Sequence, residues 1–128
     1  MWERRLERLP AIVLGRGVRI AVADGPAARL AGLAGMRSPS PDTGLLIPGC
    51  RSVHTLGMRF ALDLIWLTED GRIADVSAAV RPWRVVTLAH ARAVVECRAG
   101  MGAVFFAALA SAPPGSIPTR RRAARAAR

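Results

Sequence analysis

Hydrophobic and polar residues alternate in several short segments of the chain, a pattern that is typical of half-buried β-strands. Residues 18–24 and 72–77 show the alternation most clearly, and the second segment follows Asp70-Gly71, a strong signal for a hairpin turn. Other short runs rich in apolar residues also read as strands, at residues 44–47, 51–56 and 93–97. The pattern therefore predicts a mostly β protein in which hairpins join short strands.

The segment 60–67 is the longest predicted strand and is too continuously apolar to lie on the surface. It contains Asp63, and the residues just before it include His54 and Arg59. An unpaired buried charge is costly, so these side chains need partners or a function. In an unbroken strand His54 and Arg59 would lie on opposite faces, whereas a bulge at Gly57 would bring them to the same side.

One helix is predicted near the N-terminal third of the chain. Asp24-Gly25-Pro26 marks its start, because proline suits the first helical position. Apolar residues then recur every three positions and form one stripe, at Ala27, Leu30, Leu33 and Met36. The apolar stretch 101–112 is compatible with a last strand or with a helix. Hairpin-joined strands with one short helix predict a compact antiparallel β-barrel or sandwich-like single domain.

The 128 residues suffice for one domain with one core. Composition divides the chain into a basic N-terminal lead-in (1–16), a β domain (17–112) and a Pro/Ala/Arg-rich tail (113–128) that we expect to be disordered. The basic residues are all arginines, and the formal net charge is +10. Half of that charge lies in the last nine residues, on Arg120, Arg121, Arg122, Arg125 and Arg128.

We favour the interpretation that this tail only improves solubility, and the alternatives are that it binds nucleic acid or an anionic membrane. If the tail binds a membrane, we expect Phe105, Phe106 and Leu109 to act as an interfacial anchor. No run approaches the roughly 18 apolar residues of a spanning helix, and the N-terminus is unlike a signal peptide, so we expect a cytoplasmic protein. Cys50 and Cys97 would then stay reduced. Their spacing to the histidines predicts no metal site, and we expect no cofactor.

Several short motifs, taken in order along the chain, are similar to those of a known family. They are R-L-A-G-L-A-G-M-R at 29–37, G-L-L-I at 44–47, H-T-L-G-M-R-F-A-L-D at 54–63, R-P-W-R at 81–84 and V-V-E-C-R-A-G at 94–100. Over roughly residues 17–102 the chain resembles the DUF-192 family of small bacterial and archaeal proteins. The resemblance implies a mostly β, barrel- or sandwich-like domain with a short helix, and it implies no settled activity. The chain departs from the family pattern at Ala61, where a proline is usual, and after Gly100.

Polar residues in or beside the apolar strands form our first candidate ligand site: His54, Thr55, Asp63 and Glu96. Histidine titrates near neutral pH, so a histidine beside a carboxylate would hold a polar ligand or share acid/base work. The alternative is a buried network in which arginines such as Arg59 pair with Asp63 or Glu96 and fix the strand register. No catalytic turn accompanies these residues, so we identify no catalytic residue.

Trp83 lies between Arg81 and Arg84 and is the second candidate. An indole flanked by guanidinium groups can stack on a ring while the arginines bind an anion. Alternatively, Trp83 closes one end of the barrel. We predict a small binding or accessory module for a polar or anionic ligand. The alternatives are an enzyme that uses His54 and Asp63 for acid/base chemistry, and an adaptor for nucleic acid or membranes that works through the tail.

Overall fold

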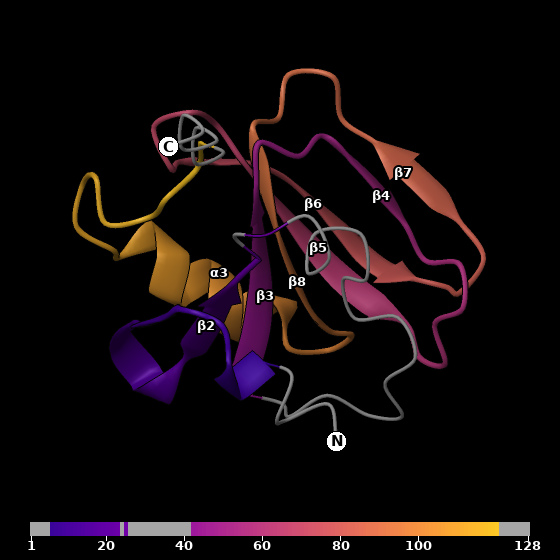
Figure 1. Cartoon of the computed structure of the whole chain (residues 1–128), viewed down its shortest axis with the longest axis horizontal. Helices are drawn as coiled ribbons and strands as arrows, with labels where there is room; N and C mark the ends of the chain where they lie inside the picture. The colour runs from indigo at the N-terminus through magenta and orange to yellow at the C-terminus, as the bar shows by residue number, and fades with distance from the viewer. Residues whose placement is uncertain (1–5, 24, 26–41, 121–128) are drawn as a thin grey trace, which may run out of the picture.

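The computed structural model of the chain describes residues 6–23, 25 and 42–120. The helix that we predicted between Ala27 and Met36, and the arginines that follow Arg120, lie outside these residues. Figure 1 shows a central sheet with helix α3 (Gly102–Ala110) on one side and a small ribbon of two strands on the other.

The larger sheet has six strands. In order across the sheet they are β1 (Ala11–Val13), β2 (Arg19–Val22), β3 (Thr43–Pro48), β8 (Ala93–Arg98), β5 (Leu62–Leu67) and β6 (Ile73–Val80). Neighbouring strands are antiparallel except β2 and β3, which are parallel and joined by a long connection. The mostly β prediction is therefore confirmed. The barrel is not, because in the described part of the chain this sheet is open and ends at β1 and β6.

The small ribbon consists of β4 (Ser52–His54) and β7 (Val85–Thr87), which pair antiparallel. β4 is shorter than we predicted, because the chain turns at Leu56-Gly57, where Gly57 has a φ of 77°. The connection to β5 is thus a turn and not a bulged strand. β7 was not predicted, since three residues are too few to show alternation. At the other end of the chain a short 3-10 turn, η1 (Gly15–Gly17), joins β1 to β2.

The sheet is covered on both faces, which explains why its central strands are so continuously apolar. Successive side chains of a strand point to opposite faces. One face packs under the ribbon, through Leu45, Leu64, Trp66, Val94 and Val53 of β4. The opposite face packs against α3, through Leu46, Ile65, Val95, Phe105 and Leu109.

Helix α3 occupies the apolar stretch 101–112 that the pattern left open between strand and helix. Phe105, Ala108 and Leu109 are buried at helical spacing and form the face toward the sheet. Gly44 makes room for them, because a Cβ there would lie 2.7 Å from Cε1 of Phe105. The membrane anchor that we considered is therefore wrong for Phe105 and Leu109. In residues 6–23, 25 and 42–120, no helix is long and apolar enough to cross a membrane.

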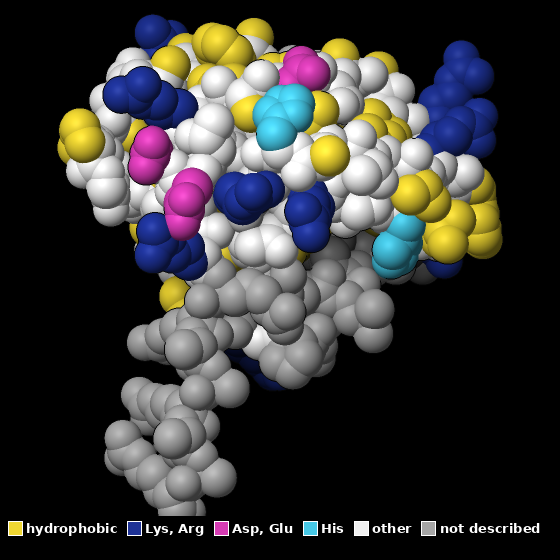
Figure 2. Space-filling model, turned by 90° about the horizontal axis from the view of Figure 1, so that it is seen from above, with side chains coloured by type: hydrophobic (Ala, Val, Ile, Leu, Met, Phe, Trp, Pro, Cys, Tyr) yellow, Lys and Arg dark blue, Asp and Glu magenta, His cyan; other side chains and the backbone are white. Residues whose placement is uncertain are grey.

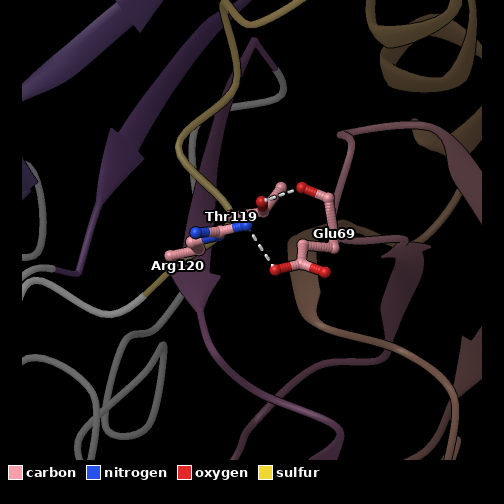
Figure 3. Close-up of polar contacts among 3 residues, drawn as sticks. All are labelled: Glu69, Thr119 and Arg120. Carbon is pink, nitrogen blue, oxygen red and sulfur yellow. Dashed lines mark hydrogen bonds and ion pairs between the residues drawn. The ribbon is translucent and has the colours of Figure 1, made fainter.

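The start of the predicted disordered tail is in fact packed on the domain. Ile117 and Thr119 are buried, and the Thr119 carbonyl oxygen accepts a hydrogen bond from the N–H of Gly49 at 2.9 Å. Figure 3 shows that the Thr119 hydroxyl donates to the Glu69 carbonyl oxygen and that Arg120 pairs with the Glu69 carboxylate at 2.6 Å. This C-terminal segment therefore belongs to the folded domain as far as Arg120.

Candidate functional site

Asp63 is buried in β5, as its place in an apolar strand predicted, but its partners are backbone N–H groups. Oδ1 accepts a hydrogen bond from Ala79 at 2.8 Å, and Oδ2 accepts from Gly100 and Gly102 at 2.9 Å each. The arginine partner that we considered for Asp63 is thus wrong for the described residues. The carboxylate instead joins β6, the turn after β8 and the first turn of α3.

The bond to Ala79 marks an irregularity in β6. The register of β5 with β6 shifts between Leu62 and Leu64, and Ala79 has a φ of 51°. An extra residue in one strand leaves a backbone N–H without a partner in the ladder. Asp63 supplies the acceptor for it, so this side chain holds the bulge in place.

Our first candidate site is not assembled as one pocket. Asp63 points to the α3 face of the sheet. Glu96 is buried in β8 and follows Val94 by two positions, so it points to the ribbon face. His54 lies exposed on β4, and Thr55 is buried beside it. His54 and Asp63 therefore lie on opposite sides of the six-stranded sheet.

Cys97 lies opposite Asp63 in the pairing of β8 with β5, and its thiol contacts the Asp63 carbonyl oxygen at 3.7 Å. Burial raises the pKa of this thiol to about 12, and the charges of Asp63 and Glu96 add to the effect. The thiol is therefore inert as a nucleophile, since the thiolate is the reactive form. In the described residues, neither Cys50 nor Cys97 forms a disulfide bond. In the described ranges no group of His, Cys, Asp and Glu is arranged to hold a metal ion.

Thr55 holds the turn that carries Trp83. Its Oγ1 donates a hydrogen bond to the Arg81 carbonyl oxygen at 2.7 Å and accepts one from the Arg84 N–H at 2.8 Å. Its backbone N–H donates to the Arg84 carbonyl oxygen at 2.8 Å, and its carbonyl oxygen accepts from the Trp83 N–H at 3.0 Å. We call this set of four bonds the Thr55 clamp. Thr55 contributes to the candidate surface by positioning it.

Trp83 is 67% exposed and has a φ of 64°. A bulky residue in the left-handed region costs roughly 1–2 kcal/mol, and an indole leaves much apolar area in water when it is not covered. The Thr55 clamp enforces this conformation. The expectation that Trp83 closes one end of a barrel is therefore wrong, because its ring points to solvent.

Other exposed apolar side chains lie next to Trp83. Val85 is 66% exposed and lies directly across the ribbon from His54, and Leu56 is 45% exposed in the turn that follows Thr55. We define the ribbon surface as His54, Leu56, Trp83 and Val85 with the exposed arginines Arg59, Arg81 and Arg84. Figure 2 shows hydrophobic side chains gathered beside a histidine and arginines at the end that carries β4 and β7. The sequence did not single out Leu56 and Val85, since one exposed apolar residue is unremarkable.

The ribbon surface is uniformly cationic. Residues 51–62 and 80–88 contain four arginines, which are Arg51, Arg59, Arg81 and Arg84, and no Asp or Glu. The ion pair in the described part of the chain joins Arg120 to Glu69, in another region. The Arg84 guanidinium donates to the Trp83 carbonyl oxygen at 3.3 Å, so it lies against the backbone of the residue that carries the indole. Arginine and tryptophan are among the residues enriched in binding hot spots.

Two solved structures share this fold. One is a "putative transcription regulator" from Sinorhizobium meliloti 1021, with 21% identity and a TM-score of 0.62, over 82% of this chain and 86% of that one. The other is a protein of unknown function from Novosphingobium aromaticivorans DSM 12444, with 19% identity and a TM-score of 0.60, over 86% of this chain and 92% of that one. No curated protein matches the chain in sequence.

The family model of DUF192, described as "Uncharacterized ACR", matches residues 12–105. This range contains every strand from β2 to β8, the Thr55 clamp and the ribbon surface. The motif resemblance is thereby confirmed, and the chain belongs to the DUF192 family.

Proposed function

We propose that the chain is a binding module that holds an anionic partner with an apolar part on the ribbon surface. The observation that carries the proposal is the conformation of Trp83, which stands 67% exposed at a φ of 64° and is fixed there by the Thr55 clamp. A fold that only needed a turn at this position would be more stable with glycine. Retaining a residue at the expense of stability is typical of a functional position.

The chemistry of the surface defines the class of partner. Trp83, Val85 and Leu56 would bury apolar area, and the indole face also attracts rings and cations. The arginines would pair with carboxylates or phosphates, for which the guanidinium fork is suited. His54 lies at the same surface and adds a ring N–H hydrogen-bond donor. A partner that matches all of these groups has negative charge next to an apolar side chain, ring or chain.

This proposal moves the ligand site from the His54/Asp63 pair to the ribbon surface. Acid/base catalysis by His54 and Asp63 has less support, because the Asp63 oxygens already accept three backbone hydrogen bonds on the other side of the sheet. We also propose a cytoplasmic location, in which the Cys50 and Cys97 thiols would stay reduced.

The test is a titration of the ¹⁵N-labelled full chain with defined polyanions, followed by NMR. The probes are poly-L-glutamate, a dodecameric oligothymidylate and vesicles of phosphatidylglycerol. We expect at least one probe to shift or broaden the indole N–H of Trp83 and the amides of 54–56 and 83–87. The Trp83→Ala substitution should lower the affinity of the chain for that probe at least tenfold, as expected when a hot-spot residue is removed.

Matched variants separate the site from general charge attraction. Phe106→Ala removes an exposed aromatic side chain from α3, and Arg72→Ser with Arg98→Ser removes two exposed charges elsewhere. These variants should bind the probe with nearly the affinity of the parent, with a loss of about twofold at most, because salt screens charges that lie far from the bound probe. If no probe perturbs the ribbon surface, or if the control variants weaken binding as much as Trp83→Ala, the proposal is wrong.

A further inference from the structure

We propose that the partner on the ribbon surface is an extended acidic peptide segment of another protein, which pairs with the free edge of β7 as a third strand. This inference rests on the proposed function and narrows it to one class of partner. It comes from the hydrogen-bonding pattern of the ribbon, which leaves one strand edge open beside Trp83.

The outward-facing backbone groups follow from the ladder of the ribbon. The N–H of Thr55 donates to the carbonyl oxygen of Arg84, and the N–H of Leu88 donates to the carbonyl oxygen of Arg51. Residues that face each other in an antiparallel pair alternate between hydrogen-bonded and non-hydrogen-bonded positions. Val53 and Val86 are therefore a bonded pair in the register of the ribbon, and the residues on either side of Val86 direct their N–H and C=O groups away from β4.

Val85 and Thr87 thus present two N–H donors and two carbonyl acceptors along the outer edge of β7. Both residues are exposed, and in the described part of the chain no strand pairs with that edge. In Figure 1, β7 lies at the outer margin of the molecule, on the side away from α3. The outer edge of β4 is less free, because the Ser52 carbonyl oxygen already accepts a hydrogen bond from the Cys50 thiol at 3.2 Å.

The side chains at this edge define the sequence of the added strand. An open edge gives affinity through main-chain hydrogen bonds, and alternate side chains give specificity. A residue of the added strand that lies beside Val85 would contact the exposed valine and the indole of Trp83, so it should be apolar. Neighbouring residues come near Arg81 and Arg84, so they should be acidic. The edge itself is only three residues long, and the side chains must supply much of the affinity.

Charge argues against two other occupants of the same edge. A second copy of this chain would bring two identical sets of arginines together, since the ribbon surface carries three of them and no carboxylate. The residues that follow Arg120 include four further arginines, so the chain's own tail is repelled as well. Nucleic acid and lipid lack an extended peptide backbone that could pair with a strand edge, and they enter the test as competing outcomes.

The test compares three synthetic peptides on the ¹⁵N-labelled full chain by NMR. The first is a nonapeptide of alternating glutamate and valine, the second is the same peptide with N-methyl groups on alternate amides, and the third replaces glutamate by lysine. We expect the first peptide to shift the amide protons of Val85 and Thr87 and to slow their exchange with solvent. N-methylation removes the donors that pair with a strand edge, so affinity should fall at least tenfold. The lysine peptide should not bind.

Two variants locate the interaction on the protein. Thr87→Pro removes an outward-facing N–H, which an edge strand tolerates, together with the hydroxyl that forms a 2.9 Å hydrogen bond with the Ser52 hydroxyl. It should abolish the protected amide pattern. The double variant Arg81→Ser, Arg84→Ser should bind the glutamate peptide at least tenfold more weakly than the parent protein does. The control variant Arg72→Ser, Arg98→Ser should bind it as the parent protein does. Because the N-methylated peptide probes the same edge on the parent protein, the test stands even if Thr87→Pro does not fold.

The outcomes distinguish the inference of strand addition from the proposed function of the ribbon surface as a binding site. If the N-methylated peptide binds as well as the parent peptide, strand addition is wrong and the ribbon surface remains a binding site. If the oligothymidylate or the vesicles perturb the ribbon surface and the glutamate–valine peptide does not, the partner class is wrong. If no probe perturbs the surface, both the partner and the proposed function are wrong.

Discussion

The backbone N–H of Gly102 donates a hydrogen bond of 2.9 Å to Oδ2 of Asp63 at the start of α3. The approach is so close that a Cβ at position 102 would lie 2.7 Å from the same oxygen, so glycine is needed there. The first N–H groups of a helix have no acceptors within the helix, and a negative charge is favourable at this end. The Asp63 carboxylate therefore fixes α3 to a central strand of the sheet.

We predict that Asp63→Asn lowers the free energy of unfolding by about 2–3 kcal/mol. The amide group of asparagine would present N–H donors to backbone N–H groups on at least one side of the site. Urea denaturation of parent and variant measures the difference. Asp75→Asn is the matched control, because Asp75 is exposed and an asparagine oxygen can still accept from Val76. The control should change stability by less than about 0.5 kcal/mol, and an equal loss in both variants would contradict the role of Asp63.

The environment of Asp63 could be predicted from the sequence only in part. A carboxylate within an apolar strand indicates burial and a partner, and both expectations were right. Its partners were not predictable from the pattern, because they depend on the register of β5 with β6 and on the turn at Gly100. Backbone N–H groups are present at every residue except proline, so the sequence does not mark the ones that a carboxylate reaches.

We predict that Thr55→Val lowers the free energy of unfolding by about 1–3 kcal/mol, although valine has nearly the same shape. The exchange removes the hydroxyl that donates to Arg81 and accepts from Arg84, and it leaves both backbone groups without that partner. Thr55→Ser keeps the hydroxyl and should lose less than half as much. Urea denaturation measures both variants. Equal losses in the two variants would mean that the methyl group of Thr55, and not the clamp, stabilises the turn.

Trp83→Gly is predicted to leave the free energy of unfolding unchanged or to raise it by up to about 1 kcal/mol. Glycine adopts a φ of 64° without the cost that a bulky residue meets there. The lost side chain makes few contacts, since it is mostly exposed. Trp66→Phe, a change in the buried core, serves as the comparison and should be destabilising. A loss of more than about 1 kcal/mol in Trp83→Gly would show that the indole has a packing role after all.

The ribbon surface could be recognised only in part from the sequence. The Arg81-Pro82-Trp83-Arg84 segment was identified from its residue types, whereas the exposure of Trp83 follows from a backbone conformation that tryptophan rarely adopts. The pairing of β4 with β7 joins residues more than thirty positions apart. Two short strands of this kind give no periodic signal, so their meeting required the structure.

We predict that Ile117→Ala lowers the free energy of unfolding by about 2 kcal/mol, whereas Arg120→Ala changes it by less than about 0.5 kcal/mol. Ile117 is buried against the hairpin turn, where its Cβ would lie 3.4 Å from a Cβ at Gly71. Arg120 forms an ion pair with Glu69, but its side chain is 79% exposed. Thermal or urea unfolding separates the two variants. A truncation that tests the arginine tail must accordingly keep residues 113–120, because a shorter chain would also lose this packing.

The raised pKa of the Cys97 thiol predicts that the free energy of unfolding depends on pH in the alkaline range. The pKa of its thiol is about 12 in the folded protein and 9.0 in an unperturbed chain, and the protein contains neither lysine nor tyrosine to titrate in the same range. Below pH 9.0 the thiol keeps its proton in both the folded and the unfolded state. Between the two values the unfolded chain loses the proton while the folded protein retains it, so rising pH favours unfolding.

The free energy of unfolding of the parent should therefore fall by about 1.4 kcal/mol for each pH unit above the unperturbed thiol value. Urea denaturation at several pH values between about 8 and 11 measures this slope. Cys97→Ala removes this titrating group and should flatten the slope. If parent and Cys97→Ala lose stability in parallel as the pH rises, burial of the thiol does not control the alkaline stability of this protein.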